Sequence, residues 1–275
     1  MTETYRTSLG TSSLDSIQLL GKEMATELMG EVSFGDLAFW LVALRRPTKG
    51  ESRLFNAILV ALADHGFTPT VLAARLTLTS APESIQGAMA AGILGGGSRF
   101  LGVTEDAAKF LAQSLSDAGE LGSDSSYEDL ATQILYDRQS RGLLVPGLGH
   151  PVHKNGDPRT PVIYKLAAEA GVFGTHLSLL AAIERVQADV FDKHLPVNGA
   201  GACGAALADL GFPPGIIRGF ALVARSAGLL GQIAEEMRDP IGLQLYAAVD
   251  RNARYVDPSE VLYSRSTRST LKDES

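Results

Sequence analysis

Helix-start signals recur along this chain, and they constrain its fold more than any other sequence feature. The segments SFGD (33–36), TKGE (48–51) and SAPE (80–83) each place a hydroxyl side chain three residues before an acid, which is the sequence form of a capping box. Apolar residues spaced by three and four positions follow, as at Leu54 and Ile58, and this spacing predicts helices with one buried face. The alternation typical of strands is not the dominant pattern, so we expect an all-α fold.

The same spacing places the remaining helices, and the breaks between them are short. No Ser-rich linker and no repeat of fixed period stands out, which argues against loosely tethered domains. The polar ends, 1–14 and 264–275, are expected to be mobile or to serve only in subunit contacts. We predict helices at about 104–117, 127–141, 159–170, 175–193, 201–210 and 214–238.

Length and charge exclude several classes of protein. A chain of 275 residues, 45% of them hydrophobic, can bury one large core or two closely packed domains. The net charge is −7 and no Lys/Arg-rich block is present, so we expect neither a nucleic-acid partner nor an anionic membrane. A basic pocket inside an acidic molecule is compatible with this balance.

The single cysteine and the N-terminus point to a reducing compartment. Cys203 has apolar neighbours and is expected to be a small buried residue rather than a nucleophile. The N-terminal residues are polar, unlike a signal peptide, and no uninterrupted apolar run reaches the roughly 18 residues that a membrane span needs. We therefore expect a cytoplasmic protein.

A loop rich in glycine, proline and basic residues, 143–161, lies between two predicted helices. Gly147 and Gly149 allow positive φ or a close approach of the backbone to a ligand, and three prolines stiffen the segment. His150 is a possible acid or base, and Arg159, nine residues later, is a possible carboxylate-binding fork. A lone G-x-G-H is also typical of a surface connection whose histidine caps a carbonyl, and both interpretations stay open on this motif alone.

The longer run GLGHPVHKNGDPR (147–159) closely resembles the motif of the citrate synthase superfamily. The resemblance extends over roughly 33–258 and is greatest to the citryl-CoA lyases and to the citryl-CoA-cleaving C-terminal module of ATP-citrate lyase. It implies a citrate synthase-like domain over 15–263, with a large helical domain, a small helical domain at roughly 159–220 and an active site between them. It also implies a homodimer.

The resemblance assigns roles to residues of the central loop. His150 would be the active-site histidine at the hydroxyl or carbonyl of the oxo acid, and Arg159 would bind a carboxylate. His153 and Lys154 would either meet the phosphates of coenzyme A or form a solvated pair. The backbone expected to lie against coenzyme A is formed by Pro146, Gly147, Leu148 and Gly149.

Two upstream segments carry further marks of the family. ADHG (63–66), with Arg75 ten residues after the histidine, resembles the first substrate histidine and makes His65 a hydrogen-bond donor to the oxo acid. A histidine and a glycine also suit a helix C-terminus for local reasons alone. In GGGSRFLG (95–102), Phe100 stands where citrate synthases carry a histidine that polarises the thioester; the segment resembles the citryl-CoA-cleaving enzymes instead, or is a connector plugged by an apolar ring.

Two downstream segments complete the pattern, with one departure. LPVNGAGA (195–202) aligns Asn198 with an asparagine of the family, but Ala200 stands where the family has an aspartate that moves a proton on the acyl group. Such a base contributes about 10²- to 10⁴-fold in rate. Arg225, in an apolar helix, is either a structural ion pair or the second clamp on the acid. A further family arginine would fall near Leu245, and Arg238 and Arg251 are out of register.

The resemblance implies a lyase that cleaves a 3-hydroxy-3-carboxyacyl-CoA of the citryl-CoA type into an acyl-CoA and a 2-oxo acid. His65, Arg159, Arg225 and Asn198 would bind the acid half, and His150 with His65 would be catalytic. No metal and no tightly bound cofactor is expected, and coenzyme A is part of the substrate. Because of Ala200, the alternatives are an enzyme for a different acyl-CoA, by condensation or thioester hydrolysis, and a non-catalytic protein that binds coenzyme A or an organic acid.

Overall fold

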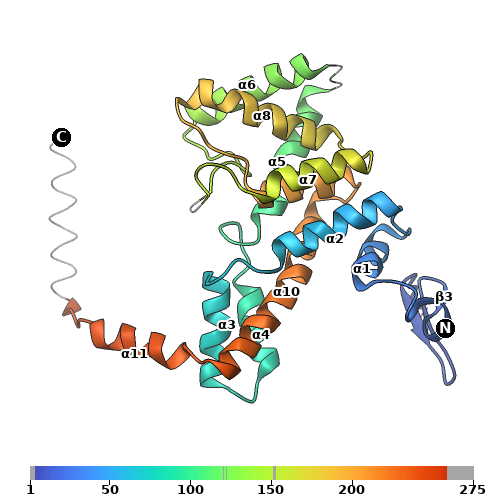
Figure 1. Cartoon of the computed structure of the whole chain (residues 1–275), viewed down its shortest axis with the longest axis vertical. Coiled ribbons are helices and arrows are strands. Elements are labelled where there is room, and N and C mark those ends of the chain that lie inside the picture. The colour runs from blue at the N-terminus through green and yellow to red at the C-terminus, as the bar shows by residue number, and fades with distance from the viewer. Residues whose placement is uncertain (1–3, 120, 122, 151–152, 259–275) are drawn as a thin grey trace.

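The computed structural model describes residues 4–119, 121, 123–150 and 153–258, so Pro151 and the polar tail 264–275 lie outside the described residues. Helices dominate, as the sequence predicts (Figure 1). One helix near the C-terminus, α11, was not predicted. The helices are α1 (Phe34–Ala43), α2 (Lys49–Ala63), α3 (Pro69–Ser80), α4 (Ile85–Leu94), α5 (Val103–Ala118), α6 (Asp124–Ser140), α7 (Arg159–Glu169), α8 (Thr175–Phe191), α9 (Gly199–Asp209), α10 (Pro214–Arg238) and α11 (Gly242–Asn252).

A small antiparallel sheet precedes the helices and corrects the prediction for the N-terminus. Strand β1 (Gly10–Ser12) pairs with β2 (Ile17–Leu19), which pairs with β3 (Lys22–Glu23), and the short π-helix η1 (Met24–Leu28) follows. Part of the segment 1–14, expected to be mobile or to serve only in subunit contacts, is therefore held by backbone hydrogen bonds within the chain, and a subunit contact there stays a prediction. Strands of two or three residues are too short to show an alternating pattern in the sequence.

Two of the three predicted helix starts are confirmed and one is wrong. Ser33 caps α1, and Thr48 caps α2 in a complete capping box with Glu51. Ser80 does not start a helix; it is the last residue of α3, and Ser84 caps α4 by accepting from the N–H of Gly87. The reason is Pro82, because the residue before a proline is disfavoured in helical conformation, which ends α3 there.

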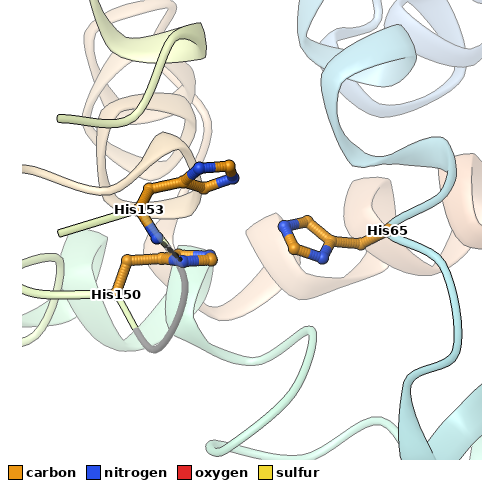
Figure 2. Close-up of side chains that lie close together, drawn as sticks. All are labelled: His65, His150 and His153. Carbon is orange, nitrogen blue, oxygen red and sulfur yellow. Dashed lines mark hydrogen bonds between the residues drawn. The ribbon is translucent and has the colours of Figure 1, made fainter. Parts of the chain in front are cut away.

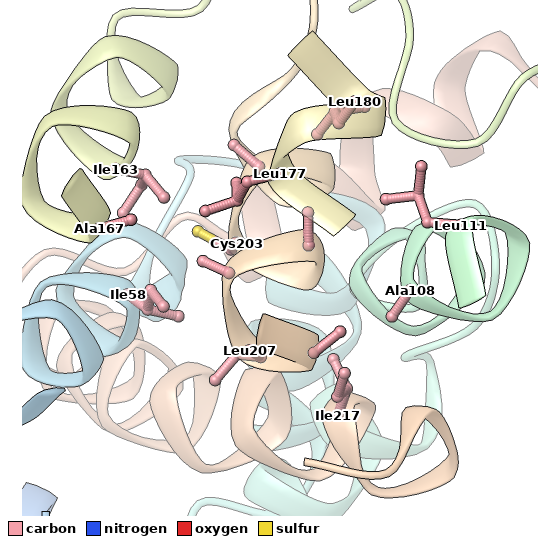
Figure 3. Packing of buried hydrophobic residues seen from close by; sticks show 14 of the residues in the cluster. Ile58, Ala108, Leu111, Ile163, Ala167, Leu177, Leu180, Cys203, Leu207 and Ile217 are labelled. Atoms are coloured by element: carbon pink, nitrogen blue, oxygen red, sulfur yellow. The ribbon is translucent and has the colours of Figure 1, made fainter. Parts of the chain in front are cut away.

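The main core surrounds α9 (Figure 3). This helix is rich in alanine and glycine, so α5, α7 and α8 pack closely around it. Cys203 lies at its centre, and burial raises the pKa of its thiol to about 12, which confirms that it is a buried small residue rather than a nucleophile. The division into a large and a small domain stays a prediction.

The long helix α10 connects the upper and lower groups of helices in Figure 1. Among the described residues it is the one helix whose length and composition would allow it to cross a membrane. It packs against α2, α3, α4 and α5, as a core helix does. A Cβ added to Gly228 would stand 1.9 Å from the carbonyl oxygen of Ala63, so this glycine lets the end of α2 rest on α10.

Candidate active site

Four segments of the chain meet at the C-terminal end of α2. The first is Asp64–His65–Gly66, which follows α2, and the second is the central loop; the others are the N-terminus of α9 and the middle of α10. The contact at Gly228 fixes the first segment against α10. The packing of helix ends, rather than one loop, therefore assembles the site.

His65, His150 and His153 form one cluster (Figure 2). The rings of His150 and His153 are tilted by 33° to each other, with centroids 4.5 Å apart. The centroid of the His65 ring lies 5.3 Å from that of His150 and 5.9 Å from that of His153. His65 is exposed and the other two are half-buried. The structure thus brings together both histidines that the sequence predicts to be catalytic and adds a third.

The surroundings of His150 favour its neutral form. Burial lowers the pKa of its imidazole, and the nearby His153, His65 and Arg159 lower it further, while Asp157 opposes the shift. Its Nδ1 accepts a hydrogen bond of 3.0 Å from the backbone N–H of His153. A neutral imidazole at pH 7 can accept a proton, so His150 is suited to act as a general base.

Arg159 lies at the site but is tied to protein partners. Its Nε and Nη2 donate to the two carboxylate oxygens of Asp157 at 2.9 and 2.7 Å, and its Nη1 donates to the carbonyl of Ala61 at 3.0 Å. Arg159, which the sequence predicts to bind a carboxylate of the substrate, therefore binds the carboxylate of Asp157. Arg159 has five N–H groups in all, so its remaining N–H groups could still reach a ligand.

Asp157 is a buried acid whose role the sequence analysis missed, although it belongs to the Asp-Pro-Arg motif. Burial would raise the pKa of its carboxyl, but hydrogen bonds from Arg159 and from the backbone N–H of Gly199 lower the pKa well below its usual value. A carboxylate held this way is a poor base. It does not replace the family aspartate at the nearby Ala200.

Asn198 holds the central loop against α9. Its Oδ1 accepts from the N–H of Gly201 at 2.8 Å, and its Nδ2 donates to the carbonyl of Gly149 at 2.8 Å. Gly147 and Gly201 are in contact: a Cβ on Gly201 would stand 2.5 Å from the Cα of Gly147, which itself has φ +92°. The observed role of Asn198 is to position this loop, and its predicted contact with substrate stays a prediction.

Arg225 is buried with donors unused. It is 5% exposed, and its Nε and Nη1 have no hydrogen-bond partner among the residues that the structure describes. The nearest acid, Asp64, stands 4.0 Å from Nη1, beyond hydrogen-bond reach. Burial lowers the pKa of its guanidinium, Asp64 opposes this, and Arg159 adds to it. Such a cation is poised to bind an anion.

Other predicted residues lie at or outside this cluster. Pro146 is half-buried and borders a cavity of about 630 Å³ that Lys109 and Arg138 also line. Lys154 is exposed. Phe100 is 41% exposed, so the interpretation of this segment as a connector plugged by an apolar ring is wrong. Leu245 lies on α11, which packs against α3.

Comparisons with known proteins agree with this architecture. Residues 12–243 match the family described as "Citrate synthase, C-terminal domain". A curated relative, "Probable ATP-citrate synthase" of Dictyostelium discoideum, is 24% identical over 254 residues, which are 86% of this chain and 39% of that protein. The chain thus spans about two fifths of the length of that relative.

Two solved structures extend the comparison. Citryl-CoA lyase from Hydrogenobacter thermophilus is 25% identical, with a TM-score of 0.80 over 94% of this chain and 99% of that chain. ATP citrate lyase from Methanothrix soehngenii, in complex with citrate and coenzyme A, is 21% identical, with a TM-score of 0.75 over 94% of this chain and 43% of that one. The all-α fold expected from the sequence is confirmed.

Proposed function

Because the chain belongs to the citrate synthase family, we propose that it is a carbon–carbon lyase of the citryl-CoA lyase type. Its substrate would be a 3-hydroxy-3-carboxyacyl-CoA, citryl-CoA or an analogue. In the reaction, a base removes the hydroxyl proton, the bond between the hydroxyl-bearing carbon and the α carbon of the thioester breaks, and the oxygen becomes the carbonyl of a 2-oxo acid. The electron pair passes to the thioester as an enolate, which is protonated at carbon to give the acyl-CoA.

The observation that carries the proposal is Arg225. Its buried Nε and Nη1 lack a hydrogen-bond partner among the described residues, and a carboxylate of the substrate would supply one. Asp64, 4.0 Å away, balances the charge without occupying these donors. The arginine lies in the same assembly as the histidines, so an acid bound there would present its hydroxyl to them.

The histidines supply the proton chemistry in this proposal. His150, whose pKa is lowered, accepts the hydroxyl proton, and His65 donates a hydrogen bond to the developing carbonyl. No tightly bound cofactor takes part, because the thioester accepts the electron pair. Coenzyme A enters as part of the substrate, along the backbone of 146–149 and near Lys154. The cavity that Pro146 borders is lined by Lys109, which is ion-paired with Glu105, and by Arg138 and Asp106, so Arg138 is its candidate partner for a phosphate.

We also propose a homodimer in the cytoplasm. Support for the dimer comes from α11, where Leu243, Tyr246 and Val249 recur three residues apart and are between 62% and 73% exposed. Apolar side chains at this spacing form one stripe on a helix. A second copy of the chain is the partner that the family resemblance favours.

Ala200 favours a second candidate. There is no acid at that position, and Asp157 is held by Arg159. We therefore identify no donor, among the described residues, for the proton that must be added to the enolate carbon. The chain would then act on another CoA thioester, by condensation or hydrolysis, or bind coenzyme A or an organic acid without catalysis.

The test is to incubate the purified protein with citryl-CoA and to follow products by mass spectrometry. We expect acetyl-CoA and oxaloacetate, with product formation lost in His150→Ala. If citryl-CoA stays intact, the citryl-CoA lyase proposal fails, and a screen of other acyl-CoA thioesters follows. Turnover of one of those would support the second candidate as an enzyme. Tight binding of coenzyme A or citrate without turnover would support the binding protein, and activity gained in Ala200→Asp would identify the missing base as the cause.

A further inference from the structure

The three-histidine cluster has a property that the proposed lyase does not need. One ring nitrogen from each of His65, His150 and His153 lies within 4.8 Å of the other two. Two of these histidines have proposed roles, and the third, His153, lies beside His150 and near His65 (Figure 2). Converging imidazoles are the side chains that transition dications prefer in proteins.

We propose that His65, His150 and His153 bind a divalent transition cation of the zinc type. In a tetrahedral zinc site with Zn–N bonds of about 2.0–2.1 Å, ligand nitrogens are about 3.3 Å apart. The cluster reaches that spacing by moving each ring by roughly an ångström. His65 can make this adjustment, since it is exposed and lies between the end of α2 and Gly66, which has φ +68°. Three protein ligands leave a fourth position for water or for an acid oxygen.

The charges around the cluster do not oppose a dication. Two arginines lie nearby, but each has a carboxylate beside it: Arg159 is bonded to Asp157 at 2.7 Å, and Arg225 is 4.0 Å from Asp64. The formal charge of these four side chains sums to zero.

Metal ligation by His150 requires the exchange of its hydrogen bond at Nδ1. The Nδ1 of His150 accepts from the backbone N–H of His153 at 3.0 Å, which fits the tautomer with its proton on Nε2. Ligation of the metal through Nε2 moves that proton to Nδ1 and gives up this bond. A single neutral hydrogen bond contributes little net free energy compared with metal–imidazole ligation.

The consequence for the site is inhibition, and this part rests on the proposed function. A metal that occupies the ring nitrogens of His65 and His150 removes the hydrogen-bond donor and the base assigned to cleavage. Zinc is therefore expected to inhibit citryl-CoA cleavage by competing with the substrate.

The experiment is a titration of the full chain with zinc chloride, by calorimetry and by competition with a chromophoric chelator, in the absence of any thioester. We expect one zinc ion per chain. Loss of even an outer-shell partner of a metal weakens affinity by about 10- to 100-fold, so His153→Asn should weaken zinc binding at least tenfold. The matched control is His194→Asn, because His194 is exposed and hydrogen-bonded to Gln187, apart from the cluster.

Cobalt provides a readout that depends on direct ligation. Visible absorption typical of nitrogen-bound Co²⁺ should develop with the same stoichiometry and be lost in His153→Asn, with circular dichroism and thermal unfolding verifying that the variant is folded. Equal zinc affinity in the wild type, His153→Asn and His194→Asn would overturn the site, as would the absence of saturable binding. Zinc binding without any cleavage activity would support the metal site and contradict the proposed function. Cleavage of citryl-CoA without zinc binding would support the proposed function and contradict the metal site.

Discussion

Two buried arginines, Arg75 and Arg225, have opposite surroundings: Arg75 lies on α3 and packs against α10, whereas Arg225 belongs to α10 itself. Arg75 is 1% exposed and donates to Gln232 and Glu236, with a further ion pair to Glu235. Its guanidinium also lies over the ring of Phe67, 5.0 Å from the centroid. Arg225 is 5% exposed, yet its Nε and Nη1 have no hydrogen-bond partner among the described residues.

The difference separates a structural cation from a binding one. A buried charge with every nitrogen hydrogen-bonded to the protein fixes the packing of α3 on α10, and it has little left to offer a ligand. A buried charge with unused donors costs stability unless an anion arrives. The spacing from His65 to Arg75 matches the family pattern, but the structure assigns Arg75 to the scaffold.

The largest effect expected is on stability, from Arg75→Met. The substitution leaves Glu236, which is 4% exposed, without its cationic partner. Breaking a buried pair in this way typically costs about 3–5 kcal/mol. Urea unfolding would measure the loss, with the exposed Arg238→Met as control. A loss no larger than that of the control would contradict the structural role of Arg75.

Arg225→Gln should show the opposite profile. Removing a buried charge whose Nε and Nη1 make no hydrogen bond to a described residue, and whose nearest carboxylate is 4.0 Å away, should leave the free energy of unfolding unchanged or increased, because the desolvation cost disappears. Binding of citrate should weaken by about 10- to 100-fold, which corresponds to the loss of one or two charge-assisted hydrogen bonds. Calorimetry with citrate tests this, and Arg225→Lys, which keeps the charge, should recover part of the affinity. Unchanged affinity in Arg225→Gln would place the anion elsewhere.

Gln232 connects the two regions and offers a smaller, sharper test. Its Oε1 accepts from Arg75 at 2.6 and 3.0 Å, and its Nε2 reaches the carboxylate of Asp64 at 3.2 Å. Gln232→Met should cost about 1–2 kcal/mol, as for a lost pair of hydrogen bonds. In double-mutant cycles we expect coupling to Arg75 above about 0.5 kcal/mol and less coupling to Arg225. Equal coupling energies to Arg75 and Arg225 would show that the two arginines belong to one network, which would contradict the separation of a structural from a binding arginine.

The smallest effect is a pH dependence at His150. The pKa of this imidazole is lowered by burial and by His153, so the folded state binds its proton less readily than the unfolded chain does. Stability should therefore rise with pH between the lowered pKa and the unfolded value of about 6.5, and stay constant above it. Denaturant unfolding from pH 5 to 8 should show this slope in the wild type and a smaller one in His150→Asn. In the pH profile of the cleavage rate, the fall in rate on the acid side should likewise have its midpoint below pH 6.5. A midpoint at or above that value would contradict the assignment of His150 as the base.

The helical fold was largely accessible from local sequence, since capping and periodicity act over a few residues. The start of α10 at Pro214 and its end at Arg238 match the prediction, and so does the complete capping box at Thr48. The short sheet over residues 10–23 and α11 gave weaker local signals. The misplaced cap at Ser80 arose because a proline two residues later decided where α3 ends.

The residue types of the candidate site were also visible in the sequence, through the resemblance of 147–159 and 63–66 to a known family. What each residue binds was not. Whether Arg159, Arg75 or Arg225 keeps donors for a ligand depends on the acids that tertiary packing brings beside them, namely Asp157, Glu236 and Asp64. The approach of His153 to His65 is equally non-local, because the two residues lie 88 positions apart and the central loop is joined to the end of α2 by the hydrogen bond from Arg159 to Ala61. Local sequence thus determined the helices, while the three-dimensional arrangement alone decided which charges are satisfied and which remain available to bind.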